Sequence, residues 1–396
     1  MDIKTRIGAS IDDERERLLG LSHAIHAQPE LGFAEYQAAR SVSATLEELG
    51  FDVEVGTADL PTALVGTYGD GSLHVGLFAE YDALPQIGHA CGHNIIAAAS
   101  VGAASALASV ADQLDITVQL FGTPAEESGG GKVLMLERGA FEGLHAALMV
   151  HPAPRDVLTF PALAVDHLRI DYTGRTAHAS GTPHLGRNAA DAFTVAQVGI
   201  GLLRQHLPDG VQVHGIVDNG GEAANVVPGH TSGSFYIRAV NREVLAEARE
   251  RIESCFEAGA LAAGCAVTIE MSGPTYTELE CDTSLEELYR KNAERLGRTV
   301  LVLPPMTRGG STDMGNVSLQ IPAIHPTIGI QCDGSTNHQP EFAEYCAMPS
   351  ADQAVLDGAT ALAWTALDLA GDAAARARLA AGQRLGPEGQ PRPSST

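Results

Sequence analysis

The order of strand-like and helix-like segments constrains this chain more than any other feature. In the first part, apolar runs at 74–82, 116–122 and 146–150 alternate with a small-residue helical segment at 94–112 and a short helix at 132–138. Such alternation favours a parallel sheet covered by helices on both faces. We therefore predict an α/β domain with a mostly parallel central sheet.

The middle of the chain follows a different order. Two helical segments, 188–206 and 242–264, lie among strand-like segments at 167–174, 211–217, 232–240 and 266–271. The order β-α-β-β-α-β is that of the split βαβ, or ferredoxin-like, fold. Because the pattern is self-contained and unlike the first part, it predicts an inserted second domain.

The predicted boundaries assign residues 1–164 and 276–385 to the α/β domain and residues 165–275 to the insertion. In the α/β domain we also expect a helix at 12–27 and, after the insertion, strands at 299–303 and 323–330 and a long Ala-rich helix. The tail, 386–396, is rich in Pro, Gly and Ser and is predicted to be disordered.

Composition excludes several classes of function. The chain is 44% hydrophobic and 19% charged, which is typical of a globular protein. Its formal charge of −24 disfavours nucleic acid as a partner, and six cysteines in 396 residues do not make a disulfide scaffold. The longest apolar-leaning stretch, 95–111, is mostly Ala, Ser and Gly, which suits a core helix better than a membrane span. With no signal-peptide pattern at the start, we expect a cytoplasmic protein without a membrane partner.

Three clusters of reactive side chains follow successive strands: GHACGHN (88–94), GTPAEES (122–128) and MVHPAP (149–154). Ligands of open α/β sheets bind outside the carboxyl ends of the strands. We therefore expect one crevice to gather Cys91, His93, Glu126, Glu127 and His151. Thiolate, imidazole and carboxylate together form a transition-metal ligand set, with zinc first and manganese as the alternative. Taken singly, Cys91 is more commonly an inert buried thiol, and each histidine is more commonly a satisfied polar group near the surface. Their occurrence together at three successive strand ends favours the metal site.

The paired glutamates predict the catalytic chemistry. Glu127 can bind a metal, and Glu126 can act as general base towards a metal-activated water and then protonate the leaving amine. The alternative is a pair of solvated loop acids. The following Ser-Gly-Gly-Gly predicts a close backbone turn, which favours the functional interpretation.

Further candidates have weaker local signals. Asp82 ends a strand and could orient a ligand histidine, whereas Glu80 could equally be a solvated acid. His338 is the best remaining ligand candidate, and His325 competes with it. Asp313 resembles a helix N-cap, together with Ser311 and Thr312, with a substrate-loop role as the alternative.

The insertion contributes candidate substrate residues. Asn225 lies in a Gly-rich loop, 220–229, and two histidines precede the helix at 188–206. Arg238 lies on a strand and could bind a carboxylate as a fork, or could be a solvated strand residue.

Several motifs together resemble the di-metal aminoacylase and carboxypeptidase family, which includes glutamate carboxypeptidase and the auxin-conjugate amidohydrolases. Within that family, the similarity points to the branch of p-aminobenzoyl-glutamate hydrolase and the β-alanyl-lysine dipeptidases. The motifs span about residues 20 to 375 in the expected order: HAIHAQPELGFAEYQAA (23–39), AEYDALPQIGHACGHN (79–94), GTPAEESGGGK (122–132), TGRTAHASGTPHLGRNA (173–189), ANVVPG (224–229) and GGSTDMGNVS (309–318).

This resemblance implies a catalytic α/β domain that binds two divalent metal ions and is split by a lid domain through which two subunits form a homodimer. The implied metal ligands are Cys91, His93, Glu127, His151 and His338. The general base maps onto Glu126 and the ligand-orienting acid onto Asp82. In the lid, His178 maps onto a histidine that reaches the partner's active site and stabilises the oxyanion, and Asn225 and Arg238 map onto positions that hold the substrate carboxylate.

The chain departs from the family pattern at two places, and PHLG (183–186) resembles the aminoacylase branches more than the dipeptidase branch. Glu80 stands where many members have a ligand histidine, and Asn94 follows Cys-Gly-His where the auxin-conjugate branch has Asp. The sequence thus predicts a metal-dependent amidohydrolase acting on a small N-acyl amino acid, aminobenzoyl-amino acid or dipeptide. The alternatives are hydrolysis of another carbon–nitrogen bond and a scaffold protein that keeps only the fold.

Overall fold

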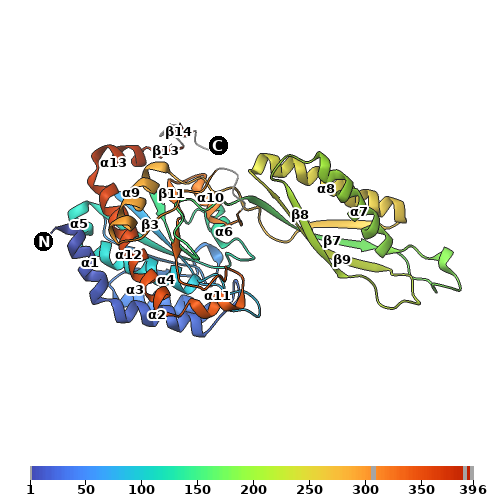
Figure 1. Ribbon diagram of the computed structural model, residues 1–396, viewed down its shortest axis with the longest axis horizontal. Helices are drawn as coiled ribbons and strands as arrows, with labels where there is room; N and C mark the ends of the chain where they lie inside the picture. Colours follow the sequence, from blue (N-terminus) through green and yellow to red (C-terminus); the bar gives the residue numbers. More distant parts are fainter. Residues whose placement is uncertain (1, 305–308, 387–389, 393–396) are drawn as a thin grey trace. The chain divides into compact units, whose positions relative to one another are not determined.

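The structure of the protein is a computed structural model that describes residues 2–304, 309–386 and 390–392. The chain forms two compact units, one from Met1–Pro161 and Leu279–Thr396 and the other from Ala162–Glu278 (Figure 1). We call them the α/β domain and the inserted domain. The predicted boundaries, 164 and 276, each lie three residues from those of the structure.

The α/β domain is built on one six-stranded sheet with the order β1-β2-β4-β3-β5-β11. The four strands β4, β3, β5 and β11 run parallel, and β1 and β2 add an antiparallel edge, so the predicted mostly parallel sheet is confirmed. The strands are β1 (Asp52–Val55), β2 (Leu64–Tyr68), β3 (Leu73–Glu80), β4 (Ile116–Thr123), β5 (Ala146–Leu148) and β11 (Ala323–Ile324).

Helices cover both faces of this sheet because its central strands are apolar on both sides. In β3, Leu77 belongs to one buried cluster and the next residue, Phe78, to another. The first cluster includes residues of α1 (Ile3–Asp13), α2 (Arg15–Ala27), α4 (His93–Ala108) and α12 (Pro349–Gly371). The second packs against α6 (Gly131–Glu137) and α10 (Met314–Ser318). Figure 1 shows α4 and α12 side by side, as their packing requires.

The small residues of α4 allow neighbouring helices to approach closely. A Cβ at Gly102 would lie 2.8 Å from Leu18 Cδ1 and 2.9 Å from Ala359 Cβ. The other α-helices among the described residues of this domain are α3 (Tyr36–Glu48), α5 (Ala111–Leu114), α9 (Thr283–Arg295), α11 (Pro340–Tyr345) and α13 (Ala373–Ala380). The Ala-rich composition that the sequence suggested for a core helix thus corresponds to a helix buried almost throughout.

Three local predictions need correction. The helix expected at 12–27 is two helices, because α1 ends at Asp13 and α2 begins at Arg15. The segment 299–303 forms only a single bridge, at Leu301. The strand expected at 323–330 is interrupted after Ile324, and chain pairing resumes with β12 (Thr327–Gly329) beside β6 (His151–Ala153). Pro326 lies in the interruption and has no N–H to donate to a ladder.

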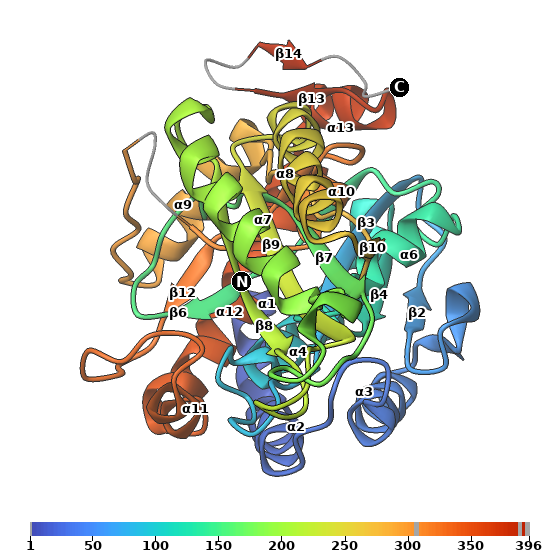
Figure 2. The same cartoon turned by 90° about the vertical axis from the view of Figure 1, so that its right-hand side faces the viewer.

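The inserted domain has the predicted ferredoxin-like order. Its antiparallel sheet runs β10-β7-β9-β8, which leaves β8 at an edge. Figure 2 looks onto α7 and α8, which lie side by side across the sheet. Between them, Tyr172, Phe193 and Phe256 form part of the core. The elements are β7 (Ala164–Thr173), α7 (Ala189–Leu203), β8 (Gln212–Asn219), β9 (His230–Ala239), α8 (Arg242–Ala263) and β10 (Ala266–Met271).

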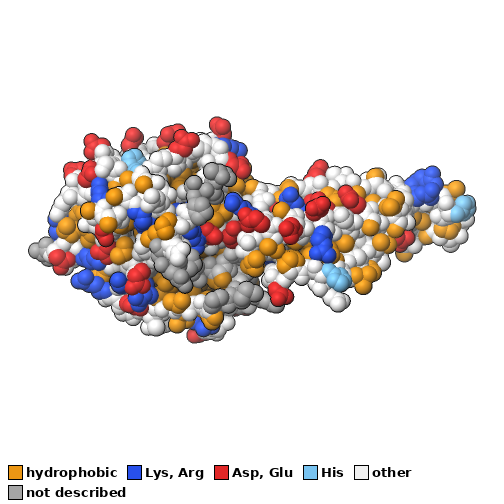
Figure 3. Space-filling model, turned by 90° about the horizontal axis from the view of Figure 1, so that it is seen from above, with side chains coloured by type: hydrophobic (Ala, Val, Ile, Leu, Met, Phe, Trp, Pro, Cys, Tyr) orange, Lys and Arg blue, Asp and Glu red, His pale blue; other side chains and the backbone are white. Residues whose placement is uncertain are grey.

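The tail and the surface complete the description. Of the tail predicted as disordered, 387–389 and 393–396 lie outside the described residues, and β14 (Pro391–Arg392) pairs with β13 (Arg384–Leu385). Among the described helices, none is both long enough and apolar enough to span a bilayer. Acidic side chains (red) are spread over the face seen in Figure 3, with basic ones (blue) between them.

Candidate metal centre

The carboxyl ends of the central strands bring the predicted residues together. Asp82 follows β3, and Glu126 and Glu127 follow β4. His151 begins β6, just after β5, and His93 is the first residue of α4. This convergence follows from parallel pairing, because β3, β4 and β5 all end at the same edge of the sheet.

Cys91 lies at the centre of the cluster. Its Sγ is 3.4 Å from His151 Nε2 and 3.5 Å from His338 Nε2. His338 Nε2 is in turn 3.4 Å from Glu127 Oε2. Two donor groups contain Cys91, namely Cys91–His93–His151 and Cys91–Glu127–His338, and a third consists of Glu80, His93 and Glu126. Within each group the donor atoms lie within 4.8 Å of one another. Cys91 is therefore common to the first two groups.

The chemistry of the donors fits a bound transition metal. His93 Nε2 and Glu127 Oε1 are buried and have no hydrogen-bond partner among the described residues. A buried polar atom without a partner is costly in free energy. A divalent cation among these atoms would satisfy them, and thiolate, imidazole and carboxylate are the ligands that zinc accepts.

Asp82 orients two of the donors at once. Its Oδ1 lies 2.9 Å from His93 Nδ1, and its Oδ2 accepts the Glu127 backbone N–H at 3.0 Å. With the Nδ1 proton shared with Asp82, the Nε2 lone pair of His93 faces the cluster. His151 is oriented in the same way, because its Nδ1 lies 2.9 Å from the Pro152 carbonyl oxygen.

His338 joins the cluster through a loop that begins far away in sequence. Its backbone N–H donates to the Ala90 carbonyl oxygen at 2.9 Å, and its φ of 69° turns the chain sharply. The amide of the preceding Asn337 donates to the Pro152 carbonyl oxygen at 3.0 Å. His325, the competing candidate, stacks on the His151 ring at 5.5 Å and belongs to neither Cys91 group. Burial lowers the pKa of His325 to about 3, so the ring is neutral.

Glu126 lies beside the donors and is 6% exposed. One of its carboxylate oxygens is 3.9 Å from His93 Nε2. Burial, followed by the negative charges of Glu80 and Glu127, raises the pKa of Glu126 well above its usual value. A carboxylate with increased proton affinity at such a site is suited to general-base work.

Glu80 and Asp313 behave differently from their simplest sequence interpretations. Both are fully buried, and both pair with the ammonium group of Lys132, at 2.5 Å and 2.6 Å respectively. Asp313 therefore does not cap its helix through its carboxylate. Thr312 Oγ1 instead accepts the Met314 N–H at 3.2 Å. Lys132 was not a sequence candidate, although its place directly after the Gly-rich turn is a signal that could have found it.

We expect Lys132→Met to destabilise the protein by about 3–5 kcal/mol, because it leaves two buried carboxylates without their cation. Denaturant unfolding measures the change. The matched control is Lys291→Met, which removes an exposed lysine paired with Glu287 at 3.3 Å and should cost less than about 1 kcal/mol. Equal unfolding midpoints for the two variants would contradict a stabilising role of the buried pairs that Lys132 forms with Glu80 and Asp313.

The candidate substrate residues of the inserted domain lie at two separate positions. His178 Nδ1 accepts the N–H groups of Ser180 and Gly181 at 3.3 Å and 3.1 Å, which leaves its proton on Nε2. The Asn225 carbonyl accepts the Ala179 N–H at 2.9 Å, so Asn225 lies beside His178. Arg238 is eight residues beyond the start of β9, roughly 27 Å along the strand at the usual rise. The domain thus brings His178 and Asn225 together and places Arg238 elsewhere.

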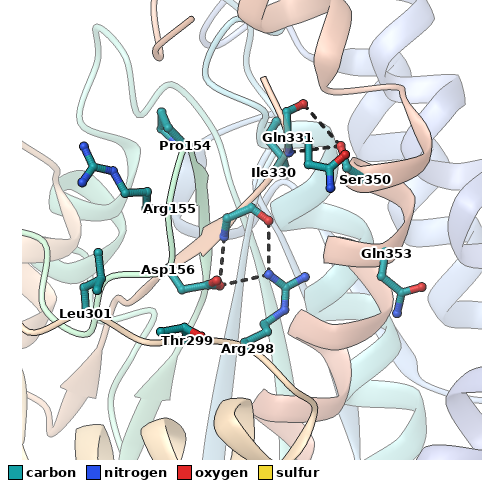
Figure 4. A pocket seen from close by; sticks show the side chains of 11 residues that line it. Pro154, Arg155, Asp156, Arg298, Thr299, Leu301, Ile330, Gln331, Ser350 and Gln353 are labelled. Carbon is teal, nitrogen blue, oxygen red and sulfur yellow. Dashed lines mark hydrogen bonds and ion pairs between the residues drawn. The ribbon is translucent and has the colours of Figure 1, made fainter. Parts of the chain in front are cut away.

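A groove of about 500 Å³ in the α/β domain includes none of the donors (Figure 4). Its floor holds Arg298, whose guanidinium donates to Asp156 at 2.9 Å and to the Gly329 carbonyl at 3.1 Å. The guanidinium also donates to Asp357 at 2.9 Å, so the charge of Arg298 is matched by two carboxylates. The groove therefore offers no reactive group of the kind that the cluster around Cys91 contains.

A split α/β domain that gathers a thiol, imidazoles and carboxylates at its strand ends has the architecture of a metallohydrolase. The chain belongs to the peptidase family M20/M25/M40, whose profile matches residues 76–364. It is 37% identical to the Xaa-Arg dipeptidase of Mus musculus over 93% of this chain and 89% of that protein. It is 32% identical to a subunit of the p-aminobenzoyl-glutamate hydrolase of Escherichia coli over 64% of this chain and 57% of that protein. These relatives are named as a dipeptidase and a hydrolase, as the sequence predicted.

Solved structures share the fold. An aminobenzoyl-glutamate utilization protein from Klebsiella pneumoniae matches with a TM-score of 0.74 at 19% identity, covering 92% of this chain and 98% of that chain. A dinuclear metal-binding peptidase of the M20 family from Bacillus subtilis matches with a TM-score of 0.64 at 21% identity, covering 88% and 98%. Both matches cover the two domains together, which confirms the predicted fold class.

Proposed function

We propose that this protein is a di-metal amidohydrolase that cleaves the amide bond of a dipeptide or small N-acyl amino acid. The observation that carries the proposal is the position of Cys91, which belongs to two groups of metal-ligating atoms beside the buried Glu126. A thiolate common to both groups would be a ligand of the metal held there. The five proposed ligands are Cys91, His93, Glu127, His151 and His338.

In this proposal the protein's own residues orient the reactants and move the proton. The metals, when bound, supply Lewis acidity that activates water and polarises the scissile carbonyl. Glu126 takes the proton from the attacking water and later donates it to the leaving amine. Asp82 keeps His93 and Glu127 in place throughout. His178 Nε2–H is suited to donating a hydrogen bond to the oxyanion.

Zinc is the metal that the donors favour, with manganese as the alternative. Cys91 supplies a soft thiolate, and His93 and His151 supply imidazoles, a set that suits zinc. Carboxylate ligation by Glu127 is also compatible with manganese. The burial and the nearby charge of Glu127 raise the pKa of the Cys91 thiol well above its usual value, so metal binding must displace a proton.

The relatives guide the choice of substrate. The Xaa-Arg dipeptidase matches across nearly the whole of both chains, whereas the p-aminobenzoyl-glutamate hydrolase matches over little more than half of its length. We therefore place dipeptides with a basic C-terminal residue first among the substrates, ahead of aminobenzoyl-amino acids and N-acyl amino acids.

A hydrolysis screen followed by mass spectrometry tests the proposal. The panel holds Xaa-Arg and Xaa-Lys dipeptides, p-aminobenzoyl-glutamate, N-acetyl amino acids and an indole-acetyl amino acid, each with zinc, with manganese and after chelation. We expect turnover that chelation abolishes and metal restores. Turnover that survives full metal removal would contradict the metal mechanism. Metal binding without turnover would instead favour another carbon–nitrogen bond, and neither metal nor turnover would favour a scaffold.

The separation of the insertion's residues supports a homodimer. A dipeptide is much shorter than the roughly 27 Å between Arg238 and the start of β9, so one inserted domain cannot present Arg238, Asn225 and His178 to the same substrate. We infer that Arg238 serves one active site while His178 and Asn225 serve the partner's. The edge strand β8 and helix α7 also expose large apolar side chains: Ile216, Val217, Val195, Val198 and Leu202.

We expect Ile216→Lys combined with Val198→Glu to give a monomer, because both side chains are more than half exposed on the proposed dimer face. Light scattering at assay concentration measures the mass, with 41.3 kDa expected for the variant and twice that for the unaltered protein. Activity should fall together with the dimer. Leu261→Lys, on α8 and 85% exposed, is the control and should stay dimeric. A monomeric unaltered protein with full activity would contradict the role of His178 in the partner's site.

A further inference from the structure

We propose that Glu35 is a positioning residue that holds the turn carrying the general base Glu126. The inference rests on the proposed function, and it concerns a residue that the mechanism above does not use. Glu35 lies in the segment PELGFAEY, which is part of a motif that carries the family resemblance but has no role in the chemistry described so far. Its side chain is 0% exposed and reaches the catalytic turn from the start of α3.

Glu35 accepts two hydrogen bonds, and one of them comes from the catalytic turn. Its Oε1 accepts the backbone N–H of Ala125 at 2.8 Å, and its Oε2 accepts the Thr62 hydroxyl at 2.8 Å. Ala125 directly precedes Glu126 and Glu127. The Glu35 carboxylate therefore holds the peptide from which the proposed base and a proposed ligand extend.

The turn at Ala125 needs such a hold because its backbone is strained. Ala125 has φ of 55°, in the left-handed region that residues other than glycine seldom adopt. Its carbonyl accepts the N–H groups of Gly129 and Gly130 at 2.9 Å and 2.8 Å, which closes the turn. A Cβ at Gly32 would lie 2.8 Å from Ala125 Cβ, so the segment before Glu35 is packed directly against the strained residue. Strain of this kind persists only where the surroundings over-determine it.

Helix α3, which begins directly after Glu35, does not need the Glu35 side chain for capping. Glu35 is the N-cap residue of α3 but makes no capping hydrogen bond. Glu30 caps the helix instead, because its Oε2 accepts the N–H groups of Gln37 and Ala38 at 2.8 Å and 3.0 Å. Within this segment, Glu30 therefore caps α3, and Glu35 binds the backbone of the turn at Ala125.

A buried carboxylate at this position is costly, which argues for a function. Burial and the negative charge of Asp82 raise the pKa of Glu35 to about 7, and no cation pairs with it among the described residues. Glutamine would avoid the cost of burying a charge. However, an amide has only one accepting oxygen, so glutamine can accept from Ala125 only if its NH₂ faces Thr62, whose hydroxyl would then have to accept instead of donate.

The test compares four variants: Glu35→Gln, Ala125→Gly, the two combined, and the matched control Glu30→Gln. Using the best substrate from the screen with saturating metal, we expect Glu35→Gln to lower kcat at least tenfold while KM stays within threefold. Ala125→Gly should recover much of that loss in the combined variant, since glycine adopts positive φ without strain. Glu30→Gln should retain kcat even though it weakens the cap of α3.

A second readout is independent of turnover. Hydrogen exchange of the metal-free protein, followed by mass spectrometry over residues 120–130, should be at least tenfold faster in Glu35→Gln and unchanged in Glu30→Gln. If no substrate is turned over, the proposed function fails while this exchange still decides the role of Glu35. Unchanged exchange in Glu35→Gln, kcat within twofold of the unaltered protein, or a kcat loss that Ala125→Gly does not relieve would overturn the proposal.

Discussion

Glu126→Gln is expected to lower kcat by about 10²–10⁴-fold, the usual contribution of a positioned general base. Glutamine has nearly the same shape but cannot accept a proton from water. Because Glu126 is not among the proposed ligands, metal content should be unchanged. Steady-state kinetics measures the loss, and elemental analysis by mass spectrometry measures the bound metal.

The control for this prediction is Glu142→Gln, which removes an exposed glutamate from the same domain. It should keep both kcat and metal content. If Glu126→Gln instead lost its metal, the residue would be a ligand and the assignments of Glu126 and Glu127 would have to be exchanged. If it kept full activity, the base would have to be sought elsewhere in the cluster.

Cys91→Ala is expected to lose most of the bound metal and to lower the activity at least 10³-fold, because the thiol belongs to two donor groups. Loss of any other single ligand should impair one metal position more than the other. Dialysed protein analysed for metal, beside kinetics at increasing zinc, measures the effect. Cys281→Ala removes a buried thiol of the same domain that lies outside both groups and should retain metal and activity.

Cys91→Ser distinguishes the two candidate metals. A hydroxyl is a harder ligand than a thiolate, so the substitution should reduce affinity for zinc more than affinity for manganese. We therefore expect manganese, but not zinc, to restore the activity of Cys91→Ser. Full zinc occupancy of both positions in Cys91→Ala would show that the thiol is not a shared ligand.

Much of this protein could be inferred from local patterns. The alternation of apolar runs predicted the parallel core of the sheet, and the order of segments predicted the inserted domain, because burial on both faces leaves a clear signature in sequence. The same logic placed Asp82, Glu126 and His151 at one sheet edge. Strands with weaker signatures were missed or misjudged, such as 299–303, where few ladder hydrogen bonds form.

Other features depended on contacts between residues far apart in the chain. The pairing of Lys132 with both Glu80 and Asp313, and the hold of Glu35 on Ala125, join segments separated by up to 181 positions. Nothing in a local pattern separates a buried, paired carboxylate from a solvated one. The choice between His338 and His325 was of the same kind, because only the folded loop brings His338 Nε2 to 3.5 Å from Cys91.

The architecture and the kinds of candidate ligand could be inferred from the sequence, since both follow from side-chain chemistry and from hydrophobic periodicity along short stretches. The pairing of Glu80 and Asp313 with Lys132 became visible only in the folded chain, as did the membership of one thiol in two donor groups. The physical reason is that periodicity records which face of an element is buried, whereas the charge state and partner of a polar side chain depend on neighbours that only folding brings together.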